Sequence, residues 1–480
     1  MMTNHKRISR RSLLRTGAAL ASAPLLMPVR AAMAEADDAP FPLRATSGQA
    51  SLRSATDGAT KVWSYNGKIP GQEIRVRQGE RVRVRVENGL EEDTTVHWHG
   101  IRTPNAMDGV PFLTQAPIPV GGAFLYEFDA LDAGTFWYHP HQRSSEQLGR
   151  GLYGPLIVEE ADPIRVDRDL TWMLDDWRIT RDGQISGDFG NGSDEAHGGR
   201  IGNTVTINGV IPNRTAVWSG ERIRLRLVNT ANARIFGLDF GDLAPVIVAM
   251  DGQPVTPHVP ESGIFVIGPA MRLDLVLDFT GKPGEVATVT DAFYEGFEYR
   301  LVDLVYGAEA LRASVPDWPV DLPKNPLAEP DMSTATRHQI VFNGGMMGQT
   351  MMGDSRGAMV DQMRQGNFWF INGKAATGAI MDPLLTLPFG TSHVFEMDNR
   401  TAWHHPIHLH GHSFRVIARD GQPTRHREWQ DTVMMAPKER VEIAFVADNP
   451  GDWMFHCHIL EHTAAGMAGV IRVAPGTIKT

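Results

Sequence analysis

Four pairs of histidines, each separated by one residue, are the feature of this sequence best suited to chemistry. Residues i and i+2 of a β-strand project from the same face, so each pair can present two imidazoles to one cavity. Eight imidazoles in one cavity would hold a cluster of two or three metal ions. Imidazole suits zinc, iron, nickel and copper, so the cluster alone does not name the metal. The pairs are His97 and His99, His139 and His141, His408 and His410, and His456 and His458.

A second ligand set surrounds the single cysteine of the chain. Cys457 lies between the histidines of the last pair and therefore points to the opposite face of its strand. His462 and Met467 follow it, and His405 precedes the third pair. One thiolate, two imidazoles and a distant thioether form the ligand set of a blue-copper electron-transfer site, whereas a zinc site with one cysteine and two histidines needs no methionine. Strand geometry places this site about 10 Å from the histidine cluster.

An internal repeat supplies the elements that must position these ligands. Segments 66–88, 208–229 and 372–399 each combine an Asn-Gly pair with a run of alternating polar and apolar residues. Such alternation predicts a strand with one face on a core and the other in water. Three copies predict three β-sandwich domains of about 120–160 residues each.

The histidine pairs divide these domains by role. The first and third copies carry two pairs each, and the second copy has no histidine at either place, so we interpret the middle domain as a spacer without copper ligands. The abundance of glycine and proline, 48 and 31 residues, also favours many short strands joined by turns. We expect the domains to span residues 35–160, 161–315 and 316–480.

The first 34 residues are typical of an export signal. A twin-arginine pattern at 9–14 precedes a mildly apolar run at 16–27 and a small-residue cleavage site at 32–34. We therefore expect residues 1–34 to be recognised by the twin-arginine export machinery and the mature protein to be periplasmic. The apolar run is too short for a stable membrane anchor.

The charge balance argues against one class of partner. Residues 1–34 contain six Lys or Arg and no acid, which leaves 40 basic and 56 acidic side chains in the remainder, a net charge of −16. A chain this acidic is a poor match for nucleic acid or for an anionic membrane surface.

The histidine motifs, with the run from His405 to Gly411 and the run from His456 to Met467, resemble the multicopper oxidase family, and most of all its bacterial three-domain laccase and cuprous oxidase branch. Gly151–Val158 resembles the end of the family's first domain. The resemblance covers nearly the whole mature chain. It implies an all-β fold of three consecutive cupredoxin-like Greek-key β-sandwich domains, and a monomeric enzyme that passes single electrons from a small reducing substrate to O2, making water.

The resemblance also implies four copper ions and their ligands. A type 1 copper is expected at His405, Cys457 and His462, with Met467 axial. The other expected ligands are His97 and His408 for a type 2 copper, His99, His139 and His458 for one type 3 copper, and His141, His410 and His456 for the other. Asp108 stands where the family places an acid that helps deliver protons, although an Asp-Gly pair is also typical of a turn.

Two departures from the family pattern concern protons and substrate. Many relatives carry a second acid directly after the last type 1 histidine, where this chain has Thr463, with Glu461 nearby. A hydroxyl can relay a proton but does not supply one by ionising. Copper-detoxifying relatives place an acid and a methionine just ahead of the first type 1 histidine, where this chain has Thr401 and Trp403.

A methionine-rich segment leaves the substrate open. Thioethers are soft ligands for Cu(I), and cuprous oxidases use such a segment in their third domain. A covering or packing segment is the alternative interpretation, because methionine fills irregular gaps. The candidate Cu(I) site comprises Met346, Met347, Met351, Met352, Asp354, Met359 and Met363, with Asp361 as a further oxygen ligand.

Three hypotheses follow for the function. We expect a laccase-like oxidase of phenols, aromatic amines or Cu(I). A dedicated cuprous oxidase for copper tolerance is the closest alternative, and a non-catalytic copper-binding or envelope scaffold protein is an alternative of another class. Scaffold relatives have lost ligands, whereas this chain keeps the full set. The three repeats and four histidine pairs exclude a two-domain copper nitrite reductase.

Overall fold

The Asn-Gly pairs of the sequence repeat form the same turn three times. The asparagines Asn66, Asn208 and Asn372 all have positive φ, between 49° and 53°, and the glycine that follows each also has positive φ. In each copy the asparagine side chain bridges two main-chain groups of the first long strand. It accepts the N–H of one residue, which is Arg44, Met173 or Val341. It donates to the carbonyl of the residue two positions before that one, which is Pro42, Thr171 or Gln339.

The alternating runs then occupy equivalent central strands. The strands β4 (Arg81–Gly89), β12 (Arg222–Asn229) and β23 (Ser392–Asn399) each pair in parallel with the first long strand of their copy, which is β1 (Phe41–Ala50), β9 (Arg168–Trp177) and β20 (Thr336–Gly344) in turn. On the other side they pair antiparallel with β6 (Ala123–Asp129), β17 (Arg272–Asp278) and β29 (Arg440–Val446). The computed structural model describes residues 39–53, 58–346, 361–376, 378 and 382–476. The export signal expected at 1–34 lies outside these residues.

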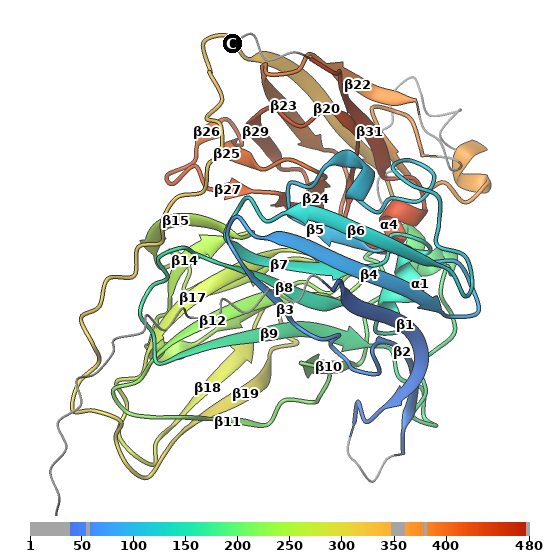
Figure 1. Cartoon of the computed structure of the whole chain (residues 1–480). Helices are drawn as coiled ribbons and strands as arrows, with labels where there is room; N and C mark the ends of the chain where they lie inside the picture. Colours follow the sequence, from blue (N-terminus) through green and yellow to red (C-terminus); the bar gives the residue numbers. More distant parts are fainter. Residues whose placement is uncertain (1–38, 54–57, 347–360, 377, 379–381, 477–480) are drawn as a thin grey trace, which may run out of the picture. The chain divides into compact units, whose positions relative to one another are not determined.

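The first sandwich encloses a core between two sheets, of strand order β2-β1-β4-β6 and β3-β8-β7-β5 (Figure 1). Val84 and Phe128 of one sheet meet Trp98 and Phe136 of the other in this core. The strands are β1 (Phe41–Ala50), β2 (Thr60–Tyr65), β3 (Ile74–Arg77), β4 (Arg81–Gly89), β5 (His97–His99), β6 (Ala123–Asp129), β7 (Gly134–His139) and β8 (Gly154–Glu159).

The second sandwich pairs the sheets β10-β9-β12-β17-β14-β15 and β11-β19-β18-β13-β16. Leu225 and Leu275 pack against Phe236 and Leu304 between them. The strands are β9 (Arg168–Trp177), β10 (Thr204–Ile207), β11 (Arg214–Val217), β12 (Arg222–Asn229), β13 (Phe236–Asp239), β14 (Val246–Met250), β15 (Gln253–His258), β16 (Ile264–Ile267), β17 (Arg272–Asp278), β18 (Val286–Asp291) and β19 (Tyr299–Tyr306).

The third sandwich pairs β21-β20-β23-β29-β25-β26, with β27 beside β25, and β22-β31-β30-β24-β28. The strands are β20 (Thr336–Gly344), β21 (Trp369–Ile371), β22 (Pro383–Leu387), β23 (Ser392–Asn399), β24 (His405–Leu409), β25 (Phe414–Arg419), β26 (Gln422–Pro423), β27 (Trp429–Gln430), β28 (Thr432–Met435), β29 (Arg440–Val446), β30 (Gly451–Cys457) and β31 (Ala468–Val473).

Short helices lie in the connections between strands. They are η1 (Asn105–Met107), α1 (Ser144–Gly149), α2 (Gly192–Ala196), η2 (Gly241–Leu243) and α4 (Leu460–Ala464). Among the residues that the structure describes, no helix has the length and apolar character that a membrane crossing needs. The architecture confirms the predicted all-β fold of three consecutive β-sandwiches.

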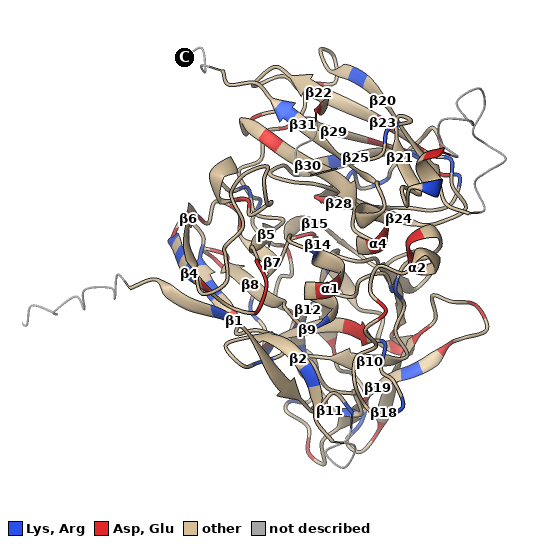
Figure 2. Cartoon of the chain, turned by 90° about the vertical axis from the view of Figure 1, so that its right-hand side faces the viewer, with Lys and Arg blue, Asp and Glu red and all other residues tan. Residues whose placement is uncertain are grey.

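The middle copy departs from the expected pattern of burial. In β4 the arginines are exposed or partly exposed, and Arg83 pairs with Glu127 on the neighbouring β6. Figure 2 marks the basic residues along β4 in blue. In β12 every residue is buried, and Arg224 and Arg226 reach Glu160 and the Thr135 hydroxyl of the first sandwich. The prediction that the polar face of this copy lies in water is wrong, because that face packs against another sandwich and its charges are paired there.

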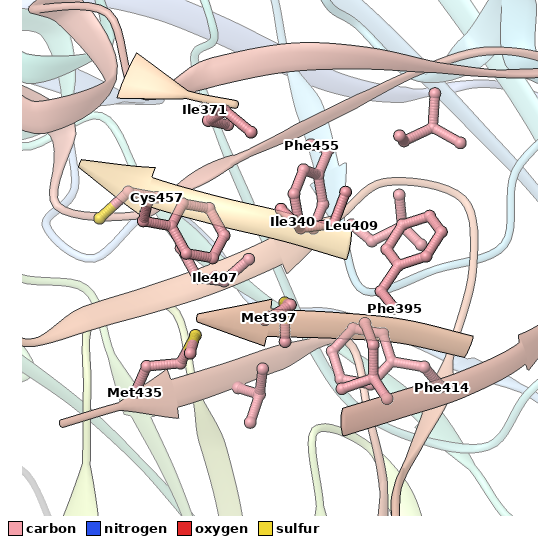
Figure 3. Close-up of a cluster of buried hydrophobic side chains, with 14 of the residues drawn as sticks. Ile340, Ile371, Phe395, Met397, Ile407, Leu409, Phe414, Met435, Phe455 and Cys457 are labelled. Atoms are coloured by element: carbon pink, nitrogen blue, oxygen red, sulfur yellow. The ribbon is translucent and has the colours of Figure 1, made fainter. Parts of the chain in front are cut away.

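The core of the third sandwich extends directly to the cysteine. Phe455 and Cys457 project from the same face of β30 into this cluster of buried apolar side chains, together with Ile407 of β24 (Figure 3). Phe455 is fully buried between Phe342 and Phe395 rings. The position of the thiol therefore depends on how tightly this core is packed.

We expect Phe455→Ala to lower the free energy of unfolding by about 3–5 kcal/mol, because it leaves a cavity in a close-packed core. Phe297→Ala is the matched control, since Phe297 is 80% exposed, and its effect stays within about 0.5 kcal/mol. Chemical denaturation of both variants measures the difference. Equal stability of the two variants would contradict this account of the core.

Candidate metal centres

Paired strands bring the histidine motifs together two at a time. In the first sandwich β5 runs antiparallel to β7, with His97 opposite His139. In the third, β24 runs antiparallel to β30, with His408 opposite His456. Alternation within β5 sends His97 and His99 toward the same side, as the sequence predicts. In the other three pairs the second histidine lies just beyond the end of its strand, yet it faces the same cluster; these residues are His141, His410 and His458.

The two sandwiches face each other through these imidazoles. The rings of His97 and His410 stack with centroids 4.0 Å apart, and those of His99 and His408 with centroids 3.9 Å apart. The His141 ring lies 5.3 Å from that of His456. All eight predicted cluster histidines are buried. The structure therefore brings them into one site at a contact between residues far apart in the chain.

Within this site, subsets of ring nitrogens lie close enough to share an ion. The ligand atoms of each subset lie within 4.8 Å of one another. His141, His410 and His456 form one subset, which is the trio expected for a type 3 copper. The ring of His458 lies beside the subset that contains His99 and His139, with centroid distances of 5.0 Å and 5.2 Å to those two rings. The subsets are His141, His410 and His456; His97, His99 and His139; and His97, His408 and His410.

Hydrogen bonds to the outer ring nitrogens orient the imidazoles. The Nδ1–H groups of His97, His139, His408 and His456 donate to the main-chain carbonyls of Asp108, Pro140, Asp431 and Cys457, at 2.7, 3.0, 2.8 and 2.8 Å. His99 is reversed, because its Nε2 faces Asp431 Oδ1 at 3.1 Å. One fixed nitrogen sets the orientation of the ring and leaves the other as a lone-pair donor.

The opposite ring nitrogens test whether a metal fits. These nitrogens are buried and have no hydrogen-bond partner, a costly state that a coordinated ion would relieve. They match the donor type that copper accepts, so the residues fit a copper cluster. They are His97 Nε2, His99 Nδ1, His139 Nε2, His408 Nε2 and both ring nitrogens of His458.

Burial also keeps these rings in the form that binds metal. It lowers the pKa of His456 to about 3, and it lowers the pKa values of His99, His139 and His458 well below the ordinary value, with neighbouring imidazoles adding to the effect. Neutral imidazole is the ligand form of histidine, so no proton competes at these nitrogens near neutral pH.

Asp108 lies beside the histidine cluster. Its carboxylate accepts from His410 Nδ1 at 2.9 Å, while its carbonyl accepts from His97. Gly109 has φ of +84°, and a Cβ there would stand 1.9 Å from the carbonyl oxygen of Val96. The Asp-Gly pair is therefore both a close-packed turn and the carrier of an acid beside the cluster.

A second centre surrounds Cys457. Its Sγ lies 3.5 Å from His405 Nδ1 and 3.6 Å from His462 Nδ1, and these two nitrogens lie 3.1 Å apart. Burial raises the pKa of the thiol, so a bound cation is needed to hold it as a thiolate. Met467 is fully buried in the same core cluster, and its carbonyl accepts the Cys457 N–H at 3.1 Å.

The outer nitrogens of this centre are also held. His405 Nε2 lies 2.8 Å from the Thr401 hydroxyl, and His462 Nε2 donates to the carbonyl of His197 at 2.6 Å. His197 follows α2 of the middle sandwich, so a segment of that sandwich covers the cysteine centre. The His197 ring stands edge-on to the Trp403 ring, with centroids 5.7 Å apart.

The two residues considered for a second proton route take different positions. The carboxylate of Glu461 accepts from the Arg200 N–H at 3.0 Å and from Asn232 Nδ2 at 2.9 Å, so it is directed to the middle sandwich. The Thr463 hydroxyl bonds the carbonyl of Cys457 and lies 3.2 Å from His456 Nδ1.

Only the ends of the methionine-rich segment are described. Met346 is half exposed, and its N–H donates to the Ala196 carbonyl at 3.0 Å, beside His197. Met363 packs against Phe370, away from any shared ligand set. Asp361 is exposed and pairs with Arg364. Met347, Met351, Met352, Asp354 and Met359 lie outside the described residues.

Sequence reasoning missed an acid at the cluster. Asp431 Oδ1 lies 3.1 Å from His99 Nε2 and 3.4 Å from His408 Nδ1, and the three residues form a close group of possible ligands. Asp431 lies between β27 and β28 and has no counterpart in a spacing motif. No pattern in the sequence distinguishes it from an ordinary loop acid.

Comparison with known proteins agrees with this geometry. Residues 47–163, 168–306 and 354–477 each match a family described as multicopper oxidase. The multicopper oxidase MmcO of Mycobacterium tuberculosis is 32% identical, and the match covers 96% of both chains. Laccase-1 of Botryotinia fuckeliana is 28% identical, over 86% of this chain and 79% of that one.

Solved structures show the same likeness. The multicopper oxidase of Pseudomonas thermotolerans is 34% identical with a TM-score of 0.80, and the match covers 91% of this chain and 99% of that one. Lac15 from a marine metagenome is 35% identical with a TM-score of 0.71, over 91% and 100%. The three sandwiches are thus cupredoxin-like domains, as expected, and the chain belongs to the multicopper oxidase family of copper-dependent oxidoreductases.

Proposed function

We propose that this protein is a laccase-like oxidase that takes single electrons from phenols, aromatic amines or metal ions and reduces O2 to water. The observation that carries the proposal is the strand β30. Its last residue, Cys457, belongs to one centre, while the residues on either side, His456 and His458, belong to the other. The two centres are therefore joined by a few covalent bonds.

The ligand sets support a binding scheme for four copper ions. His405, Cys457 and His462 would hold a mononuclear type 1 ion, with Met467 as a further ligand, and the eight clustered histidines would hold a type 2 ion and a type 3 pair. When bound, copper supplies the one-electron redox chemistry, and four ions match the four electrons that convert dioxygen to water. No ligand of the scheme is replaced in this chain, which argues against a non-catalytic scaffold.

The residues that cover the cysteine centre determine where an electron donor can approach it. His462 is fully buried, and its outer nitrogen is held by the His197 carbonyl. A substrate at the surface therefore meets the partly exposed rings of His197 and Trp403 rather than His462 itself. These residues admit flat aromatic donors, which stack on such rings.

Protons reach the cluster through its own side chains in this proposal. Asp108 is one hydrogen bond from the His410 ring, so its carboxyl group would hold and pass protons to the site of oxygen reduction. Thr463 at His456 relays a proton but does not supply one by ionising.

We also propose, from the leader alone, that the twin-arginine signal carries the protein to the periplasm. We further propose that the protein acts there as a monomer.

We expect Cys457→Ser to abolish the blue absorption and the oxidase activity, because a hydroxyl does not replace the thiolate as a soft ligand. Circular dichroism should show the fold retained, since the change is nearly isosteric. Visible absorption and oxygen uptake of the copper-loaded variant measure the effect. A blue and active variant would contradict the assignment of the mononuclear centre.

We expect Asp108→Asn to slow oxygen uptake about 100-fold, because the amide accepts a hydrogen bond but does not exchange a proton. Reduction of the blue centre by donor without oxygen should keep its rate, since among the residues that the structure describes the Asp108 carboxylate bonds a cluster histidine and no residue of the cysteine centre. Stopped-flow absorption separates the two half-reactions. Equal slowing of both, or no slowing, would rule out a proton-delivery role.

A dedicated cuprous oxidase is the second candidate function. The observation that favours it is the hydrogen bond from Met346 to Ala196, which anchors one end of the methionine-rich segment beside the covered cysteine centre. Thioether ligands there would bring Cu(I) close to His197.

Oxygen uptake with a phenolic donor and with Cu(I) distinguishes the two candidates. The test variant replaces Met347, Met351, Met352 and Met359 by leucine, which keeps side-chain size and removes the thioether. For a laccase we expect phenol turnover to exceed Cu(I) turnover and to stay within about twofold in the variant. Turnover mainly with Cu(I), reduced at least about tenfold by the substitutions, would instead establish the cuprous oxidase.

A further inference from the structure

The middle sandwich carries no copper ligand of the scheme above, yet one of its side chains reaches the histidine cluster. Arg272, the first residue of β17, is fully buried. Its Nη1 and Nη2 lie 2.8 and 2.5 Å from the two carboxylate oxygens of Asp431 in the third sandwich. Its Nε donates to the carbonyl of Thr135 in the first sandwich at 3.1 Å. One guanidinium group thus connects all three sandwiches.

Asp431 and Thr432 transmit this contact to two cluster histidines. Asp431 Oδ1 faces His99 Nε2, and the Asp431 carbonyl accepts from His408 Nδ1. The Thr432 hydroxyl lies 3.1 Å from each of the same two nitrogens. The rings of His99 and His408 are stacked, so a shift of this dipeptide would turn both together.

A second residue of the middle sandwich fixes the main chain of the dipeptide. The side chain of Asp251 accepts the N–H groups of Asp431 and Thr432 at 3.2 and 3.0 Å and that of Arg272 at 2.9 Å. Asp251 has φ of +48° and occupies the tight turn before β15. The acid, the arginine and the dipeptide therefore form one closed hydrogen-bonded unit.

Two glycines of the first sandwich make room for this unit. A Cβ at Gly100, directly after His99, would stand 2.2 Å from Arg272 Nη2 and 2.6 Å from Asp431 Oδ2. A Cβ at Gly134, at the start of β7, would stand 2.1 Å from the carbonyl oxygen of Gly252. The backbone of the first sandwich thus lies so close to this unit that any residue larger than glycine would clash at these two positions.

We propose that Arg272 and Asp251 are positioning residues that orient His99 and His408 through Asp431 and Thr432, so that the middle domain helps to build the cluster it does not ligate. The guanidinium fork fits a carboxylate through two parallel bonds and so sets its angle as well as its position. Partners one step behind a ligand control metal affinity for this reason. The inference rests on the proposed copper scheme, and it replaces the interpretation of the middle domain as a spacer.

The test compares two buried arginines of the middle sandwich. Arg272→Met removes the fork at Asp431. Arg226→Met is the matched control, because Arg226 is equally buried and bonds Asp169, Asp274 and Thr135 without touching a cluster histidine. Apo proteins are reloaded with copper against a chelator, and the readouts are copper content, the type 2 signal in electron paramagnetic resonance, and the blue absorption.

We expect Arg272→Met to weaken type 2 copper binding about 10- to 100-fold while the blue absorption stays at the wild-type level. Arg226→Met should show no selective loss of the type 2 signal. A wild-type signal and copper content in Arg272→Met would overturn the proposal. The same selective loss in Arg226→Met would also overturn it, because the effect would then follow from general loosening of the domain contact.

Arg272→Lys keeps the test decisive if the methionine variant does not fold. Lysine preserves the charge but not the fork, so we expect a folded protein with an altered type 2 signal and intact blue absorption. A type 2 signal identical to wild type would overturn the positioning role. Wild-type protein that binds copper without any type 2 signal would contradict the copper scheme itself, and that failure is visible before any variant is examined.

Discussion

The whole site depends on one constraint, that most of its buried imidazoles have one nitrogen hydrogen-bonded to the protein so that the other remains free to bind a metal. The partners are mostly main-chain carbonyls, as at His97, His139 and His408, which sets these rings by the course of the backbone. His99 is held from its other nitrogen by Asp431 and so presents Nδ1 instead. These outer hydrogen bonds fix the tautomer and the orientation of each ring that has one.

Strand alternation explains how two centres share one segment. Phe455 and Cys457 point into the core of the third sandwich, and His456 points to the cluster on the opposite face. The apolar packing that stabilises the domain therefore also places the thiol. The same strand carries a structural face and a chemical face, so the two centres remain at a constant separation.

The middle domain repeats the fold of its neighbours but uses its polar face differently. The arginines of β4 face outward, whereas Arg224 and Arg226 of β12 are buried in ion pairs with acids. Buried pairs of this kind contribute little net stability, and removing one partner is strongly destabilising. Their role here is geometric, because buried charged groups with fixed partners hold the three sandwiches in a defined arrangement around the cluster.

The sequence by itself determined the ligand types, the strands that carry them and the threefold repeat, because two-residue spacing and alternation are local properties of a strand. It predicted the cluster histidines and Cys457 in this way, whereas Asp108 was expected only from the resemblance to the family. Only the tertiary structure decided that the arginine face of β12 is buried, that Glu461 is directed away from the cluster, and that Asp431 and Arg272 meet beside His99. Those contacts join residues between 64 and 332 positions apart, and no local pattern encodes a partner that another domain supplies.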